Sequence, residues 1–523
     1  MANLKSLFKD TAIYGLSSIV GRFLNYLLVP LYTAKMSAAS GDYGIVTNAY
    51  AYTALLMALL TYGMETTFFY YSNKKGENPD RVYSTTLITV GFTSLLFVAL
   101  VTSCIGWIAP WMGMAYTQHP SYIITMAIVV ALDAFQAIIF AYLRREKRAF
   151  KFATLKLLFI FLNIGLNLLY FVALPAMYQH WPEVVATIYS PTVGVGYVFY
   201  LNLVCTSVIM LCMVKELTAV PWRWDWSLLR RMLAYSWPIL ILSVMGVINQ
   251  SASQIVFPKF YPGADGAAQL GIYGAAIKIA MIMALITQAF RYAYEPFVFG
   301  ADRDTKELSK KKRMQADATK FFLIFTLVAY LAVLAGIDVL KFIIAPDYWV
   351  GLRVVPIVMA AEIMMGIYFN LSFWYKLDGI DDEGEKRSVN LNLWGAVFSG
   401  FGCLMLLLVN WLFIPHFSYM ACAWAGVAAY GSAMVLSYVV GRFRYPQLLP
   451  PYPLRDMAVY TLIAAALSAV AMMTDLGNTW ANTAVKTVLL LLFCGVVFKR
   501  EHMGTMMAKL PVVGRFFRGR DVR

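Results

Sequence analysis

The sequence predicts an all-α integral membrane protein of about 14 transmembrane helices, with two parallel six-helix lobes and two additional C-terminal helices. Hydrophobic residues make up 60% of the 523 positions and charged residues only 14%. The charges occur in short clusters between long apolar runs, as in a chain that crosses a bilayer every ~20 residues. A repeated helix–loop–helix pattern predicts the two lobes.

Each apolar run is long enough to span the hydrocarbon core of a bilayer, which is ~30 Å thick. The first run follows Lys5 and Lys9 and continues through Leu31. It is too long for the hydrophobic region of a signal peptide, so we expect it to be retained as the first helix. The predicted helices are 11–34, 44–71, 83–109, 120–143, 152–174, 190–214, 231–257, 268–299, 317–344, 352–376, 388–413, 417–441, 456–474 and 480–498.

Basic residues predict the orientation, because cytoplasmic segments of membrane proteins are enriched in Lys and Arg. If the N-terminus is cytoplasmic, the cytoplasmic segments hold most of the 43 basic residues, including those in 144–151, 303–313 and 499–523. We therefore expect both termini in the cytoplasm. The opposite loops contain Lys35, Lys259, Lys341 and Arg353.

The internal repeat relates the first two helices to the seventh and eighth. Pro30 near the end of the first helix matches Pro258, and Gly44 at the start of the second matches Gly271 at almost the same offset. Six helices separate the copies, an even number, so both lobes have the same orientation in the membrane. The predicted parts are an N-lobe over 1–216, a C-lobe over 217–443, helices 13 and 14 over 444–498, and a basic cytoplasmic tail over 499–523.

Several classes of function are disfavoured. The net charge of +15 is spread between apolar runs and forms no single basic face, so we predict no nucleic-acid partner. The chain has no GxxxxGK[ST] phosphate loop and no HExxH motif. The six cysteines lie singly within apolar runs, where they are small packing residues, and the four histidines lie singly near helix ends. We predict no metal site, no cofactor and no enzymatic activity.

Polar residues inside the membrane indicate a hydrated cavity. Charged groups within the hydrocarbon cost several kcal/mol, so they face protein or water. Ser18, Arg22 and Asn25 share one face of the first helix. The repeat places Gln250 at the corresponding level of the seventh helix, with Asn249 beside it. We predict that both polar faces line a central substrate cavity.

The eighth helix extends this predicted cavity. Gln288, Arg291 and Glu295 share one face, and Lys278 lies on another face nearer the external end. Guanidinium groups bind phosphate through paired hydrogen bonds, and amides and tyrosines bind hydroxyl-rich sugars. These residue types favour a lipid-linked glycan pyrophosphate or another anionic amphiphile as the substrate.

Intramembrane carboxylates are candidates for coupling transport to a gradient of Na⁺ or H⁺ or to the membrane potential. The candidates are Glu65, Asp133, Glu295 and Glu362. Other interpretations stay open: Glu295 neutralises Arg291, and the asparagines join neighbouring helices. Lys156, Lys320 and Lys486 are interpreted as side chains that extend toward a membrane surface.

Four short motifs stand out in the sequence: Pro30-Leu31-Tyr32-Thr33, Asp42-Tyr43-Gly44-Ile45, Gly63-Met64-Glu65-Thr66 and the run 288–297. They resemble motifs of polysaccharide flippases in the multidrug/oligosaccharidyl-lipid/polysaccharide (MOP) exporter superfamily. With the fourteen-helix plan and the repeat, the resemblance extends over nearly the whole chain.

The resemblance implies a flippase of the bacterial cytoplasmic (inner) membrane that moves undecaprenyl-pyrophosphate-linked oligosaccharide between leaflets by alternating access. Such a protein serves the biosynthesis of surface polysaccharides such as O-antigen and lipopolysaccharide, together with membrane lipids and polysaccharide assembly proteins. By position, Arg22 and Arg291 take the role of the family's basic cavity residues. One departure concerns the external gate: a basic residue often follows the Leu-Tyr-Thr motif, whereas Ala34 follows it here and Lys35 comes one position later.

Two other functions stay open. A cation-coupled exporter of small molecules from the same superfamily fits the general plan, but the two extra helices disfavour it. A membrane-embedded glycan polymerase or glycosyltransferase normally carries a large external loop with catalytic residues. The longest external loop predicted here is 175–189, which is too short for a folded catalytic domain.

Overall fold

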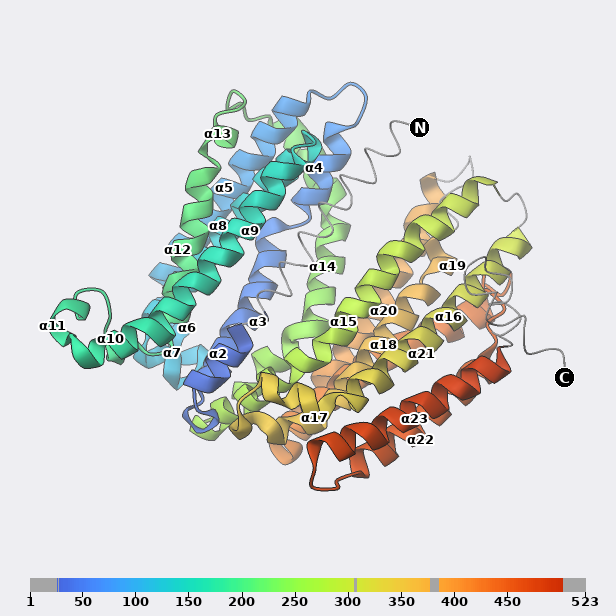
Figure 1. The fold of residues 1–523 in the computed structure, drawn as a ribbon. Coiled ribbons are helices and arrows are strands. Elements are labelled where there is room, and N and C mark those ends of the chain that lie inside the picture. The colour runs from blue at the N-terminus through green and yellow to red at the C-terminus, as the bar shows by residue number, and fades with distance from the viewer. Residues whose placement is uncertain (1–25, 27, 305–307, 377–384, 502–523) are drawn as a thin grey trace. The chain divides into compact units, whose positions relative to one another are not determined.

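The fold is that of a computed structural model, which describes residue 26 and residues 28–304, 308–376 and 385–501 (Figure 1). For 291–304, 308, 311, 373, 376 and 385–393 it describes the backbone alone. All regular elements in the described part of the chain are helical. Twelve helical segments of that part are long and apolar enough to cross a membrane, and Gly196–Cys212 is a shorter apolar helix. The prediction of an all-α integral membrane protein is confirmed.

Contacts divide the chain into two compact units, which are described separately here. Unit 1 comprises Met1–Lys278, Asp347–Gly351 and Ser399–Ala429. Unit 2 comprises Ile279–Pro346, Leu352–Phe398 and Tyr430–Arg523. The division into lobes over 1–216 and 217–443, with helices 13 and 14 over 444–498, stays a prediction.

Unit 1 contains most of the helices that the sequence predicts in its first half. The predicted first helix falls largely outside the described residues, and α2 lies at its end. The helices of unit 1 are α2 (Leu28–Lys35), α3 (Asp42–Thr61), α4 (Met64–Ser72), α5 (Pro79–Ser103), α6 (Ile105–Met112), α7 (Met114–Gln118), α8 (Pro120–Arg145), α9 (Ala149–Leu168), α10 (Leu174–His180), α11 (Pro182–Val185), α12 (Gly196–Cys212), α13 (Val214–Leu217) and α14 (Trp226–Phe260), the first part of α15 (Ala264–Asp304), residues 399–417 of α20 (Glu385–Phe417) and residues 419–429 of α21 (Tyr419–Arg444).

Several predicted helices of unit 1 are interrupted: the predicted helix 83–109 breaks at Cys104 between α5 and α6, and two others break within the span. The predicted helix 44–71 is divided into α3 and α4 at Tyr62 and Gly63, which have φ angles of 33° and 72°. Left-handed backbone ends an α-helix, and glycine adopts it without steric cost. The predicted helix 152–174 passes through a π-helical turn at Leu169–Ala173 before α10. Helical periodicity in the sequence does not reveal either interruption, because both keep the chain apolar.

Unit 2 holds the remaining helices. Both α22 and α23 pack against α16, and they also pack against each other. The helices are the rest of α15, α16 (Leu308–Ala335), α17 (Ile337–Leu340), α18 (Val355–Leu371), α19 (Phe373–Lys376), α20 (Glu385–Phe417) through Phe398, α21 (Tyr419–Arg444) from Tyr430, α22 (Leu454–Met473) and α23 (Thr479–Arg500). Four 3₁₀ turns complete the described elements of the two units. Ala38–Ser40 and Pro191–Val193 lie in unit 1, Lys341–Ile343 lies in unit 2, and Pro346–Val354 is divided between the two.

Side-chain caps mark several helix starts. Asn78 precedes Pro79 and accepts hydrogen bonds from the backbone N–H groups of Asp80 and Arg81. Asn478 caps α23 in the same way. A side-chain oxygen at this position satisfies backbone donors that have no partner within the helix. These caps explain why the helices begin close to the predicted positions.

The apolar residues are distributed as expected for a protein surrounded by lipid. Met64, Phe68 and Tyr83 are fully buried in the core of unit 1, whereas Phe92 and Leu95 on α5 are 66% and 73% exposed. Exposed side chains of this size along a membrane span contact acyl chains without a hydrophobic cost.

Candidate functional site

Unit 1 brings several intramembrane polar residues together on facing helices. The Oδ1 atom of Asp133 on α8 accepts a hydrogen bond of 3.3 Å from the Thr206 hydroxyl on α12. Gln136, one turn further along α8, donates a hydrogen bond of 2.9 Å to the Thr206 carbonyl oxygen. Asn202 on α12 donates to the Tyr50 hydroxyl of α3 at 3.1 Å. We call Asp133, Gln136, Asn202, Thr206 and Tyr50 the α8–α12 polar set.

Lys156 on α9 supplies a positive charge beside this set. Its Nζ atom lies 4.0 Å from the centre of the Phe140 ring, a favourable cation–π contact. Its charge also interacts with the carboxylates of Asp133 and Glu65. The sequence suggested only that Lys156 extends toward a membrane surface, because helical periodicity does not reveal which carboxylates on other helices face it.

Glu65 is paired with a cation. Its Oε1 atom accepts a hydrogen bond from the Arg144 guanidinium, and both side chains are partly exposed. The Arg144 guanidinium also lies 5.0 Å from the centre of the Phe69 ring. This ion pair joins the start of α4, just after the break at Tyr62 and Gly63, to the end of α8.

Asn249 and Gln250, the predicted site residues of the seventh helix, differ in their surroundings. Asn249 is 8% exposed and donates hydrogen bonds of 3.3 Å to the carbonyl and hydroxyl oxygens of Ser399 on α20. Ser253 on the same helix accepts a hydrogen bond of 2.9 Å from Asn410. Gln250 is exposed. Part of this polar face therefore joins helices within unit 1, an interpretation that the sequence left open.

Other predicted site residues are placed only in part. Ser18, Arg22 and Asn25 lie outside the described residues. Arg291 and Glu295 lie on α15, of which the structure describes the backbone there. The remaining two, Lys278 and Gln288, are half-buried on α15. The assignment of these residues to a substrate cavity stays a prediction.

Glu362 on α18 of unit 2 is a half-buried carboxylate. Its Oε2 atom is shielded from solvent and has no hydrogen-bond partner among the described residues. A buried carboxylate oxygen without a partner favours the protonated form or a bound cation. The environment of Glu362 differs in this respect from that of Glu65, whose charge is neutralised by Arg144.

Two buried ion pairs were not predicted. Glu216 is 1% exposed, and both of its carboxylate oxygens lie 2.7 Å from Nζ of Lys151. Lys486, 6% exposed, lies 2.6 Å from Oδ2 of Asp338. The sequence shows each lysine near a helix end, but it does not show the partner, which comes from a distant part of the chain.

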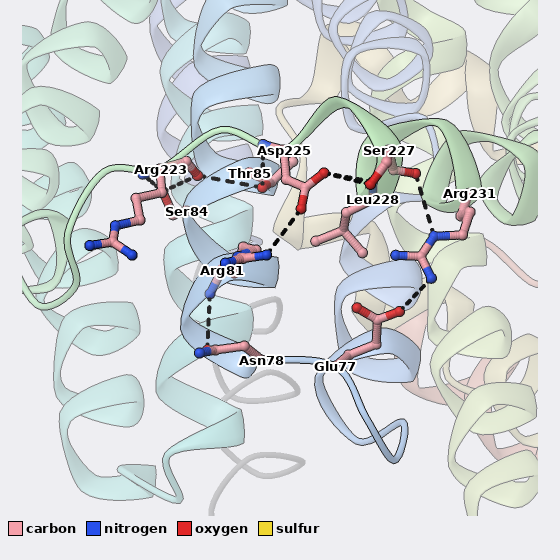
Figure 2. Close-up of polar contacts among 10 residues, drawn as sticks. All are labelled: Glu77, Asn78, Arg81, Ser84, Thr85, Arg223, Asp225, Ser227, Leu228 and Arg231. Carbon is pink, nitrogen blue, oxygen red and sulfur yellow. Dashed lines mark hydrogen bonds and ion pairs between the residues drawn. The ribbon is translucent and has the colours of Figure 1, made fainter.

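A polar network fixes the segment that leads into α14 (Figure 2). Arg231 on α14 lies 2.7 Å from a carboxylate oxygen of Glu77, in the turn before α5. Asp225, the N-cap of α14, lies 3.4 Å from Arg81. The Ser84 hydroxyl donates a hydrogen bond of 2.8 Å to the Arg223 carbonyl oxygen. These contacts hold residues 223–231 against the start of α5.

The described residues contain no group of three or more His, Cys, Asp or Glu side chains that is suited to a metal ion. The cysteines of the described part are free thiols. The α8–α12 polar set has one carboxylate with hydroxyl and amide neighbours. A carboxylate can take up a proton, and carboxylate, hydroxyl and amide oxygens can coordinate an alkali cation.

Comparisons with known proteins give consistent results. A family model described as polysaccharide biosynthesis protein matches residues 7–291. The fold is similar to that of lipid II flippase MurJ in an inward closed conformation, with a TM-score of 0.64, 14% identity and coverage of 94% of this chain and 99% of the flippase. It is also similar to an inward-facing multidrug resistance MATE family transporter of the MOP superfamily, with a TM-score of 0.61, 14% identity and coverage of 84% and 98%. No curated protein sequence matches the chain.

Proposed function

The chain belongs to the polysaccharide biosynthesis family, and we propose that it is a flippase of the MOP superfamily that translocates an undecaprenyl-pyrophosphate-linked oligosaccharide across the cytoplasmic membrane. The observation that carries this proposal is the family model, which matches more than half of the chain. The protein is a multi-pass membrane protein. The bacterial inner membrane, with both termini in the cytoplasm, is the location that fits a substrate assembled inside the cell.

A lipid-linked substrate is supported by the extent of the structural similarity. The lipid II flippase covers 94% of this chain, whereas the multidrug transporter covers 84%. This difference fits a chain that carries α22 and α23 beyond a twelve-helix plan. A substrate with a long lipid tail needs protein surface that a small soluble substrate does not need.

We assign binding of the pyrophosphate to Arg22 and Arg291. Guanidinium groups form paired, charge-assisted hydrogen bonds with phosphate oxygens. Ser18, Asn25, Gln250 and Gln288 would supply hydrogen bonds for the sugars, together with Asn249 and Lys278. Alternation of two six-helix lobes would then expose the site to one leaflet at a time, and release requires weaker binding in the outward state.

Coupling to a Na⁺ or H⁺ gradient, or to the membrane potential, is assigned to the intramembrane carboxylates. Asp133 and Glu362 are the stronger candidates. Asp133 has hydroxyl and amide neighbours as well as the charge of Lys156, and Glu362 has a shielded oxygen without a partner among the described residues. Glu65 and Glu295 are weaker candidates, because Arg144 neutralises Glu65 and Arg291 lies one turn from Glu295.

The decisive experiment measures the leaflet distribution of a lipid-linked glycan in vesicles that contain the purified protein. We expect wild-type protein to expose the glycan on the second leaflet, and Arg22→Ala and Arg291→Ala each to abolish this exposure. Arg230→Ala is a matched control, because Arg230 is an exposed basic residue of α14 outside the assigned site. Wild-type flipping by both Arg22→Ala and Arg291→Ala would refute the site.

A second candidate function is cation-coupled export of small molecules. The similarity to the multidrug transporter favours it, with a TM-score of 0.61. The same vesicles distinguish the two functions. Gradient-driven accumulation of cationic dyes without glycan flipping would favour the exporter. A membrane-embedded glycan polymerase or glycosyltransferase would instead change the length of the glycan. We propose that the protein performs no such chemistry and that it cooperates with polysaccharide assembly proteins.

A further inference from the structure

Unit 2 contains a cavity of about 470 Å³ where α16 begins and α21 ends. Its lining combines cationic, hydroxyl and proline side chains. The lining residues are Ser309, Lys312, Arg313, Tyr438, Arg442, Pro446, Leu449, Pro450, Pro451 and Tyr452. We call this cavity the basic pocket.

The charges of the basic pocket are not balanced within it. Lys312, Arg313 and Arg442 line the pocket, and its lining contains no acidic side chain. Arg313 and Arg442 form no ion pair or hydrogen bond with another described residue. The Nζ atom of Lys312 donates a hydrogen bond of 2.6 Å to the Gln447 carbonyl oxygen, which leaves the positive charge uncompensated. Three cations around one cavity create a positive potential that attracts an anion.

One wall of the pocket is rigid before any ligand arrives. Pro446, Pro450 and Pro451 have restricted φ angles. Tyr445, just before this wall, stacks on the fully buried Trp374 at 5.3 Å between ring centres. Leu449 is 7% exposed within the same aromatic cluster. A wall held in this way binds a ligand without a large loss of conformational entropy.

The positions of the pocket's cations at the ends of candidate spans indicate that the pocket lies at the depth of lipid headgroups. Lys312 is the first residue of the candidate span Lys312–Ala335, and Arg442 is near the end of Tyr419–Arg444. The side chain of Phe443, next to Arg442, is 83% exposed. An exposed aromatic ring at the end of a span fits the interface between headgroups and acyl chains. The basic pocket thus has cations at the phosphate level and an apolar side chain beside them.

We propose that the basic pocket binds the phosphate group of an anionic phospholipid, such as phosphatidylglycerol, in the leaflet at this surface. The guanidinium groups of Arg313 and Arg442 bind the phosphate oxygens, and Lys312 adds a third positive charge. Tyr438 supplies a hydroxyl for the glycerol headgroup. The acyl chains lie along the exposed face near Phe443. This lipid is a bound component of the protein and not its transported cargo.

The test uses full-length protein in neutral detergent micelles and native mass spectrometry with three probes: phosphatidylglycerol, phosphatidylcholine and inorganic phosphate. The variant Arg313→Gln/Arg442→Gln removes two charges from the pocket. The control Lys75→Gln/Arg230→Gln removes two charges from exposed residues of unit 1. All of these positions are solvent-exposed, so unchanged melting temperatures are expected and are checked first.

We expect wild-type and control proteins to bind phosphatidylglycerol in preference to phosphatidylcholine. The pocket variant should bind phosphatidylglycerol at least about tenfold more weakly, because two charge-assisted contacts are lost. Wild-type affinity in the pocket variant overturns the proposal. If inorganic phosphate binds and phosphatidylglycerol binds no better than phosphatidylcholine, the ligand is soluble phosphate and the lipid assignment is wrong.

Discussion

Gly271 on α15 packs against Gly44 at the start of α3, so closely that a Cβ atom on Gly271 would lie 3.0 Å from the Gly44 backbone nitrogen. A Cβ atom on Gly44 would overlap with the backbone oxygen of Ala267. These are the two glycines that the internal repeat relates to each other. Equivalent positions that meet in this way are typical of packing around a pseudo-twofold axis. Backbone contact of this kind requires residues without a side chain.

Gly44→Ala is therefore expected to destabilise the protein by about 2 kcal/mol, because the new methyl group would force α3 and α15 apart. Gly165→Ala is the matched control, since a Cβ atom at Gly165 on α9 would meet nothing within 4 Å. The control should be neutral or slightly more stable, as alanine is the better helix former. Thermal unfolding of the purified variants in detergent checks both. Equal melting temperatures for Gly44→Ala and wild type would contradict the close packing.

The buried Glu216 makes unit 1 sensitive to loss of its cationic partner. Lys151→Met is expected to cost about 3 kcal/mol, because only Arg148, at 3.4 Å, would then neutralise a carboxylate that is 1% exposed. Glu216→Gln should cost less, about 1–2 kcal/mol, since both cations are partly exposed and become hydrated. Denaturation curves of the two variants give the comparison. If Glu216→Gln lost more stability than Lys151→Met, the cost of leaving the buried carboxylate with fewer cations would be small, contrary to this prediction.

The pair of Asp338 and Lys486 in unit 2 is suited to a double-mutant cycle. Lys486→Met alone leaves a carboxylate that is 14% exposed without its partner and should cost about 3 kcal/mol. The double variant Asp338→Asn/Lys486→Met removes both charges and should be more stable than Lys486→Met alone. The free energies of unfolding of the four proteins measure the coupling. Additive effects would show that the 2.6 Å contact is energetically neutral.

The environment of the Asp225 carboxylate leads us to expect that the stability of the fold falls at acidic pH. Its carboxylate accepts hydrogen bonds from the Leu228 backbone N–H and the Ser227 hydroxyl, and these hold its pKa below the ordinary value of 3.8, with a smaller contribution from Arg81. A lowered folded-state pKa means that the ionised carboxylate stabilises the fold at pH above 3.8. This contribution disappears as pH falls through the lower folded-state value. Asp225→Asn retains the helix cap and removes the charge.

We expect the melting temperature of wild type to exceed that of Asp225→Asn at about pH 6, and the difference to narrow only at more acidic pH, below 3.8. Thermal scans of both proteins across this range provide the measurement. Asp475→Asn is a second variant of the same kind, because hydrogen bonds from Gly477 and Asn482 also lower the pKa of Asp475. A constant difference down to acidic pH would refute the role of the Asp225 charge.

The sequence by itself determined the membrane class and the approximate position of nearly every described span. This was possible because bilayer crossing requires about 20 consecutive apolar residues, a property of local sequence. The break at Tyr62 and Gly63 and the π-helical turn were missed, because both preserve that apolar pattern. Family membership also followed from short local motifs, and the family model confirmed it.

Only the tertiary structure decided which charges meet. In the structure Lys151 pairs with Glu216, Lys486 pairs with Asp338, and Arg144 pairs with Glu65. The residues of the α8–α12 polar set also come into hydrogen-bonding contact. The three cations of the basic pocket likewise come from segments more than 100 residues apart. Pairing between helices depends on how the chain packs in three dimensions, and helical periodicity reports only which face of its own helix a residue occupies.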